Sequence, residues 1–332
     1  MTGRQAAFVA AKLAFACAII WWLMHRGDST RVWTSIRDAH RGPIVLGVLL
    51  CMSTVLVGGW RWRRLLAAIG LPVPLSTTIA IAQIGQFFMV FLPGPTGDDF
   101  TRMLYISRIS KGRIGEACTT VLLDRLIGLA SVLGLALVCI PSKWALMNTS
   151  RQSSLLAWGM VAAGALVCGG GIVFFALPRK CIARIRDRLP GILPAGKVRR
   201  QFHRIGELLV LNRPAIASVI AAAVVTQLIL CLVCWLAGIA VGIDAPLSLW
   251  MSFVPIVLAA NAVPITIAGL GVREYLLVLF LGVVGHIADE KALAASLVVF
   301  AMTLTACLFG GLVYIFYRPK ADAVRIPDSE GV

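Results

Sequence analysis

Long stretches without a charged side chain recur along the whole chain, separated by short charged segments. A helix needs about 20 apolar residues to cross the hydrocarbon core of a bilayer, and most of these stretches are that long. The pattern therefore predicts an all-α, polytopic membrane protein that forms a single integral membrane domain over residues 1–332. The uncharged stretches are 42–60, 65–97, 126–142, 152–178, 214–243, 245–272 and 292–317.

Composition and charge agree with this prediction. Hydrophobic residues make up 59% of the chain and charged residues 14%, and the mean hydropathy is +0.89. The net charge of +16 would suggest nucleic acid in a soluble protein. In a membrane protein it is typical of basic loops on the cytoplasmic side, so we expect no nucleic-acid partner. The strongly basic segment 178–213 and the tail 318–332 are accordingly placed in the cytoplasm.

The basic loops also predict the path of the chain. The apolar N-terminal run is interpreted as a retained signal anchor, which puts both termini in the cytoplasm. Arg61, Arg63 and Arg64 are placed in the cytoplasm, just after a span that ends at residue 60. The loop 25–42 is placed outside, where an amphipathic helix at the interface is one interpretation. The six predicted full spans are 6–24, 43–60, 114–140, 154–177, 215–240 and 293–316.

Two further segments are predicted to be hairpins, because each begins and ends on the same side of the membrane. They cover residues 75–107 and 247–286, and they enter from opposite faces. Each is either re-entrant or made of two short spans. Pro and Gly interrupt each of them, and paired interruptions in the two halves of a transporter point to a binding site at the midplane. The sequence thus predicts an inverted repeat with halves of about 43–177 and 215–316. The predicted helix-breaking residues are Pro93, Gly94, Gly97, Pro264, Gly269 and Gly271.

Charged residues follow both interruptions, and two more lie inside a predicted span. An ionised side chain near the bilayer centre costs at least about 2.5 kcal/mol, so such groups pair or face a polar cavity. We therefore predict one shared cavity that holds an anionic headgroup, with arginines as its ligands. Structural alternatives remain open: Asp124-Arg125 as a charge pair that joins two helices, Asp98-Asp99 as a helix cap, and Arg273-Glu274 at a wet interface. The candidate residues are Asp98, Asp99, Arg102, Asp124, Arg125, Arg273 and Glu274.

The sequence gives little indication of a metal or cofactor. Cys231 and Cys234 form a C-x-x-C pattern, but it lies in the middle of a span without a His or acidic neighbour. Asp98-Asp99 resembles a fragment of a motif that binds magnesium and diphosphate, although further spaced acids are missing. We expect no resident metal, no cofactor and no catalytic residue.

Four motifs in order resemble the lysylphosphatidylglycerol synthase transmembrane, or flippase-like, family. They are Trp60-Arg-Trp-Arg-Arg-Leu-Leu, Phe91-Leu-Pro-Gly-Pro-Thr-Gly-Asp-Asp-Phe-Thr-Arg102, Leu122-Leu-Asp-Arg-Leu126 and Ala268-Gly-Leu-Gly-Val-Arg-Glu274. The resemblance covers about residues 5–318 and implies a membrane domain that handles lipids. It does not carry over lysyl transfer, because we expect no room for an aminoacyl-transferase domain after Arg318. Asp124-Arg125 and Gly97-Asp98-Asp99 depart mildly from the family's usual Glu-Arg and Gly-Gly-Asp.

The expected function is the translocation or binding of a phospholipid or lipid-linked headgroup between leaflets, in a bacterial-type inner membrane. One alternative is a non-catalytic partner in a lipid or glycan pathway, with segment 178–213 docking a cytoplasmic enzyme or anionic lipid. Another is a membrane-embedded headgroup transferase that uses Asp98 or Asp99. The expected partners are membrane lipids, either anionic phospholipids or lipid-linked glycans.

Overall fold

The structure is a computed structural model that describes residues 29–91, 96–110, 113–139, 213–261 and 272–317, with a few positions between 158 and 169. Every element in this part is a helix, which confirms the predicted all-α class. Four helices are long and apolar enough to cross a membrane: α3 (Arg41–Ala68), α6 (Ile114–Cys139), α11 (Arg213–Ala240) and α14 (Asp289–Phe316). The others are shorter: α2 (Ser29–Arg37), α4 (Leu75–Phe91), α5 (Thr96–Ile109), α12 (Leu247–Asn261) and α13 (Val272–Gly285).

These four long helices are four of the six predicted spans. The other two predicted spans, 6–24 and 154–177, fall mainly outside the described residues, as do segment 178–213 and the tail 318–332. One predicted boundary is wrong, because α3 does not end at residue 60 but continues to Ala68. The reason is burial: Trp62, Leu65 and Leu66 are at most 2% exposed and hold the last two turns inside the protein. The three arginines Arg61, Arg63 and Arg64 therefore lie on a helix and not in a loop.

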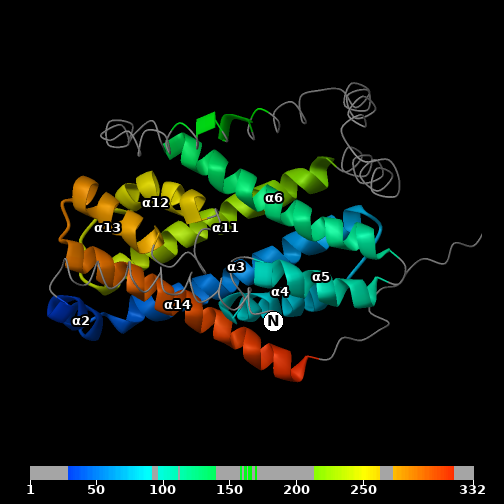
Figure 1. The fold of residues 1–332 in the computed structure, drawn as a ribbon, viewed down its shortest axis with the longest axis horizontal. Helices are drawn as coiled ribbons and strands as arrows, with labels where there is room; N and C mark the ends of the chain where they lie inside the picture. Colours follow the sequence, from blue (N-terminus) through cyan, green and yellow to red (C-terminus); the bar gives the residue numbers. More distant parts are fainter. Residues whose placement is uncertain are drawn as a thin grey trace, which may run out of the picture.

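The described chain consists of two halves with the same order of elements. A long helix, two short helices and a second long helix follow one another as α3–α4–α5–α6 and again as α11–α12–α13–α14. We call α4 and α5 hairpin 1, and α12 and α13 hairpin 2. Figure 1 shows the two hairpins at opposite ends of the bundle. The N–H of His40, just before α3, donates to the carbonyl of Ala240 at the end of α11 (2.8 Å), so the two first helices are antiparallel.

The order and direction of the described helices agree with the predicted inverted repeat, whereas the bounds of its halves, about 43–177 and 215–316, stay a prediction. The residues between the two helices of each hairpin, 92–95 and 262–271, lie outside the described residues. Five of the predicted helix-breaking residues are there: Pro93, Gly94, Pro264, Gly269 and Gly271. The sixth, Gly97, is described and lies in the first turn of α5.

The turn between the first long helix and the first short helix is similar in the two halves, both in sequence and in hydrogen bonding. Ala68-Ile-Gly-Leu-Pro-Val-Pro-Leu-Ser76 corresponds to Ala240-Val-Gly-Ile-Asp-Ala-Pro-Leu-Ser248. Gly70 and Gly242 both have a positive φ, of 74° and 72°, which ends each long helix in a left-handed residue. The next N–H reaches back to the helix in both halves, from Leu71 to Leu66 and from Ile243 to Gly238, at 2.9 Å each.

A basic side chain holds each of these turns from the start of the last helix of the same half. Arg113 donates from Nη1 to the carbonyl of Gly70 (3.0 Å), and Lys291 donates from Nζ to the carbonyl of Gly242 (3.2 Å). Cations near the last carbonyls of a helix are favoured by its dipole. The repeat therefore extends from the order of helices to individual hydrogen bonds.

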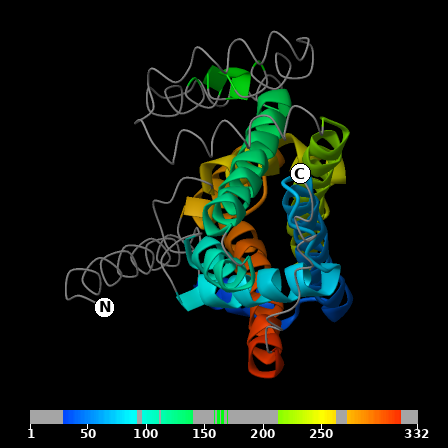
Figure 2. The ribbon, with the colours of Figure 1, turned by 90° about the vertical axis from the view of Figure 1, so that its right-hand side faces the viewer.

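The two halves pack against each other through their long helices and through their hairpins. Helices α3 and α11 lie side by side along one flank, as Figure 2 shows in a view along the bundle. Hairpin 1 packs on α14 and hairpin 2 packs on α6, so each hairpin lies against the last helix of the other half. Gln83 donates to the carbonyl of Ala306 (2.9 Å) across the first contact, and the thiol of Cys139 reaches the carbonyl of Met251 (3.2 Å) across the second.

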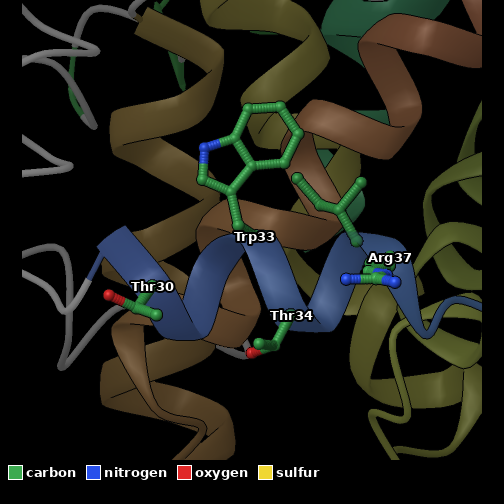
Figure 3. Close-up of a pocket in the computed structure, with 5 residues that line it drawn as sticks. Thr30, Trp33, Thr34 and Arg37 are labelled. Atoms are coloured by element: carbon green, nitrogen blue, oxygen red, sulfur yellow. The ribbon is translucent and has the colours of Figure 1, made fainter.

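Helix α2 lies outside this repeat and packs on α14. Val32 faces the protein and is 1% exposed, whereas Trp33 is 66% exposed. A cavity of about 510 Å³ is lined by Thr30, Trp33, Thr34, Ile36 and Arg37. Figure 3 shows Trp33 and Thr34 on different sides of the helix. An amphipathic helix thus forms within the loop predicted at 25–42, and its location at a membrane interface stays a prediction.

Candidate functional site

Asp124, on α6, is the centre of a buried group of charges from three helices. Arg61 of α3 contacts it through two hydrogen bonds, from Nε to Oδ1 (2.5 Å) and from Nη2 to Oδ2 (2.9 Å). Arg102 of α5 donates from Nη1 to the same Oδ2 (3.1 Å). The side chains of Asp124, Arg102 and Arg61 are 5%, 8% and 11% exposed. Asp124 therefore bridges two guanidinium groups away from bulk water, and it ties α6 to α3 and α5.

Two more carboxylates complete this group, and both come from the first turn of α5. Asp98 accepts a hydrogen bond from Nε of Arg102, one helical turn later, at 2.8 Å. Asp99 forms an ion pair with Arg125 of α6. We call these residues the hairpin 1 network. Its members are Arg61, Asp98, Asp99, Arg102, Asp124 and Arg125.

The packing around the network fixes the position of its side chains. Helix α4 approaches Asp98 so closely that a Cβ atom on Gly85 would overlap its Oδ1. The guanidinium of Arg102 lies 5.6 Å from the ring centre of Trp62, a cation–π distance. The indole of Trp62 is fully buried and donates to the hydroxyl of Thr120 on α6 (3.0 Å). Hairpin 1 is thus held to α3 and α6 by packing as well as by charge.

Hairpin 2 carries a smaller charged group at the start of α13. Arg273 donates from Nη2 to Oε1 of Glu274 (2.5 Å), and the hydroxyl of Ser296 on α14 lies 3.4 Å from the same oxygen. Arg273 is 8% exposed and Glu274 is fully buried. The guanidinium of Arg273 also lies 5.8 Å from the ring centre of Phe300. Both residues correspond in place to the acidic turn that opens α5.

Two donors and one acceptor at hairpin 2 are buried without a hydrogen-bond partner among the described residues. They are Nε of Arg273, Nε1 of Trp250 and Oδ1 of Asn261, the residue that ends α12. Burying a polar group without a partner costs roughly 1–3 kcal/mol. Arg273 and Asn261 lie on either side of residues 262–271, and their two atoms are places where a ligand gains hydrogen bonds at no cost to the described ones.

Buried thiols of α14 and α11 lie near each of the two charged groups. Cys307 of α14 is within electrostatic range of Asp98 and of Cys51 on α3. Cys234 of α11 is in turn within electrostatic range of Cys51 and of Arg273. The structure thus brings six charged side chains together at hairpin 1, and it places Arg273 and Glu274 in a second group. Whether both groups line one cavity, as the sequence predicts, stays a prediction.

The chemistry of the described residues is that of ion pairing. Among them, no group of three or more His, Cys, Asp or Glu side chains is placed to hold a metal ion. The six described cysteines are free thiols, including the pair Cys231 and Cys234 on α11. The hairpin 1 network contains three arginines and three aspartates, so an anion enters it only by exchange of ion-pair partners.

Sequence reasoning missed Arg61, because the span was predicted to end one residue before it. The signal was present in the apolar residues that follow, Leu65 to Ile69, and in Gly70, which is a typical helix terminator. It also paired Asp124 with no particular arginine, since partners from other helices cannot be read from spacing. Gly85, Trp62 and Ser296 were likewise found only from their contacts.

Comparison with known proteins agrees with this architecture. No curated protein matches the chain. The family described as the lysylphosphatidylglycerol synthase TM region matches residues 9–311, which include all the described helices of the two halves up to the last turn of α14. The chain is therefore a multi-pass membrane protein of a lipid-related kind, and it belongs to the lysylphosphatidylglycerol synthase transmembrane-region family.

Proposed function

We propose that this protein moves a phospholipid or a lipid-linked headgroup between the two leaflets of the membrane. The buried charges shelter the headgroup while the acyl tails stay in lipid. Arg102, Arg125 and Arg273 bind the headgroup phosphate, because guanidinium groups match the geometry of phosphate oxygens. Asp98, Asp124 and Glu274 balance these arginines when the site is empty. The family match and the matched charges at both hairpins support this proposal.

The observation that carries the proposal is the Nε of Arg273, which has no hydrogen-bond partner in the part of the chain that the structure describes. This donor belongs to a side chain that is 8% exposed, and it lies in the first turn of a helix, where free N–H groups also favour an anion. A structural ion pair has no need of an unfilled buried donor. A phosphate oxygen that enters from the membrane interior would fill it.

The arrangement of the two hairpins supports an alternating mechanism. Hairpin 1 and hairpin 2 enter the bundle from opposite ends and each packs on the other half. A movement of one half against the other would open the path beside one hairpin as it closes the path beside the other. The headgroup would then meet the arginines of both hairpins in turn.

A leaflet-resolved assay tests this function. The full chain is placed in vesicles of phosphatidylcholine with a trace of fluorescent phosphatidylglycerol, and an impermeant quencher reports the label in the outer leaflet. We expect exchange well above that of empty vesicles. Arg273→Ala removes the unfilled donor, so the exchange rate should fall at least tenfold, which corresponds to about 1.4 kcal/mol.

Lys291→Ala is the matched control, since it removes an exposed cation from the same half that binds only the turn at Gly242. It should keep the exchange rate of the unchanged protein. A rate that matches empty vesicles would contradict the proposed function for this lipid. An unchanged rate in Arg273→Ala, and also in Asp124→Ala, would contradict the roles given to these residues.

A further inference from the structure

The hairpin 1 network is electrically balanced as it stands. Three guanidinium groups face three carboxylates, and every ion pair within it is buried or partly buried. An anionic headgroup would add one negative charge to this site. An uncompensated charge inside a protein costs several kcal/mol, so the added charge needs a positive partner. No guanidinium of the network is free to be this partner, because each one already binds a carboxylate.

The connections of the network show which carboxylate loses its partner. Arg102 joins two of them, Asp98 at 2.8 Å and Asp124 at 3.1 Å. When Arg102 turns to a phosphate, Asp124 keeps its two hydrogen bonds to Arg61. Asp99 keeps its ion pair with Arg125. Asp98 alone is left without a cation among the described residues.

The neighbours of Asp98 make this state costly for a carboxylate. On its own helix it faces Asp99 and Arg102, and from α6 it faces Asp124, whereas Arg125 of α6 is paired with Asp99. Helix α3 contributes Arg61, which is already bound to Asp124. Helix α4 has no charged residue and brings the backbone of Gly85 against it, and α14 contributes the thiol of Cys307. A released Asp98 therefore faces two like charges from Asp99 and Asp124.

We propose that Asp98 takes up one proton when Arg102 binds the headgroup phosphate, so that the protein moves an anionic headgroup together with a proton. An O–H bond forms on Asp98 with a proton from the adjoining aqueous phase, and it breaks again when Arg102 returns. The added proton balances the charge of the phosphate, so the network and its ligand together keep the same net charge. This inference rests on the proposed function and adds a second species to what the protein carries.

Calorimetry of ligand binding tests the inference. The probe is dihexanoyl phosphatidylglycerol, which is anionic and soluble, added to the purified full chain in detergent. Titrations in two buffers of different ionisation enthalpy give the number of protons taken up per ligand. We expect about one. Because the proton binds with the anion, the affinity should fall as pH rises, by about tenfold per pH unit above the titration of Asp98 in the ligand-free protein.

A pair of substitutions locates the proton. Asp98→Asn imitates the protonated side chain, so ligand binding should remain while proton uptake falls to zero and the pH dependence disappears. Glu116→Gln is the control, because this carboxylate pairs with Arg113 outside the network, and the variant should still take up about one proton. Proton uptake that persists in Asp98→Asn would overturn the assignment to this residue. If Asp98→Asn does not fold, the proton count of the unchanged protein still decides the coupling.

The outcomes separate this inference from the function on which it rests. Binding or leaflet exchange without proton uptake would overturn the coupling and leave the proposed function intact. Absence of both binding and leaflet exchange would overturn both. Proton uptake that accompanies binding, and acidification inside vesicles during inward exchange, would support the coupling.

Discussion

In the described part of the chain, the two hairpins share a backbone plan but carry buried charged groups of different size. Hairpin 1 is tied to α3 and α6 by a network of six charged side chains. At hairpin 2 the described ion pair joins adjacent residues, Arg273 and Glu274, and the hydroxyl of Ser296 on α14 lies 3.4 Å from Glu274. The turns that lead into the hairpins, by contrast, match down to the basic side chain that holds each glycine carbonyl.

This difference indicates that the two halves share the geometry of their turns more closely than the charged residues of their hairpins. A turn needs a left-handed residue in either half, since the chain must reverse at both ends of the bundle. The charges are free to differ, because each half needs only to balance those it buries. We infer that a ligand at hairpin 1 must displace existing ion pairs, whereas at hairpin 2 it can first use the unfilled donor of Arg273.

Asp124→Ala should have the largest effect on stability. It leaves Arg61 and Arg102 without the carboxylate that they share, and removal of one partner from a buried ion pair costs about 3–5 kcal/mol. The measurement is unfolding in mixed micelles with increasing sodium dodecyl sulfate, followed by tryptophan fluorescence.

The control for this prediction replaces both partners. Asp124→Leu together with Arg61→Met removes the charges in pairs, and it should cost less than Asp124→Ala because no guanidinium of that pair stays unmatched. If the single substitution costs less than about 1 kcal/mol, the network is not what fixes hairpin 1, and the comparison between the hairpins fails.

Gly85→Ala should be the next most harmful change. Its Cβ would overlap the Oδ1 atom of Asp98, so α4 and α5 must separate or Asp98 must leave Arg102. Overpacking of this kind typically costs about 1–3 kcal/mol. The same unfolding titration measures it.

Gly58→Ala is the matched control for Gly85→Ala. Gly58 also lies inside a helix, but a Cβ there meets no atom within 4 Å. Alanine is a better helix former than glycine, so this variant should be more stable by about 0.5–1 kcal/mol. Equal effects of the two substitutions would show that the close approach of Gly85 to Asp98 does not matter.

The fold was predictable from the sequence because the bilayer imposes a length on apolar stretches. The predicted spans 114–140, 215–240 and 293–316 agree with α6, α11 and α14 to within a few residues. The two hairpins were predicted from the orientation of the loops. A single crossing by segment 75–107 or 247–286 would have put basic loops outside the cytoplasm. The end of α3 was missed because Trp60 and three arginines are typical of a membrane interface, whereas here packing continues the helix.

The sequence predicted which charged residues belong to the site better than it predicted which of them pair with one another. All seven candidate residues lie within the described helices, and burial of Arg102, Asp124, Arg273 and Glu274 agrees with the cost argument made from sequence. Which arginine binds which aspartate depends on the rotation of α3 against α6. That rotation is set by tertiary contacts such as the one between Trp62 and Thr120, and no spacing along one helix contains it.

Gly70→Ala and Gly242→Ala should have equal, moderate effects. Both residues have a positive φ near 70°, where a side chain costs about 1–2 kcal/mol. Unfolding titrations of both variants test whether the two turns contribute equally to stability, as their similar geometry suggests. A cost at Gly70 far above that at Gly242 would mean that hairpin 1 depends on its turn and not only on its charges.

Ser296→Ala should have the smallest effect of these changes. The hydroxyl of Ser296 lies 3.4 Å from Oε1 of Glu274, which is at the long limit of a hydrogen bond, and Arg273 already donates to the same oxygen at 2.5 Å. Loss of so long a contact should cost less than about 1 kcal/mol in the unfolding titration. Thr120→Val removes the 3.0 Å contact between α6 and Trp62 of α3, beside the hairpin 1 network, and it should cost more. If Ser296→Ala instead costs as much as Asp124→Ala, hairpin 2 is cross-linked to α14 as firmly as hairpin 1 is to α6. The unfilled donor of Arg273 would then belong to a rigid element, and the division of roles between the hairpins would be wrong.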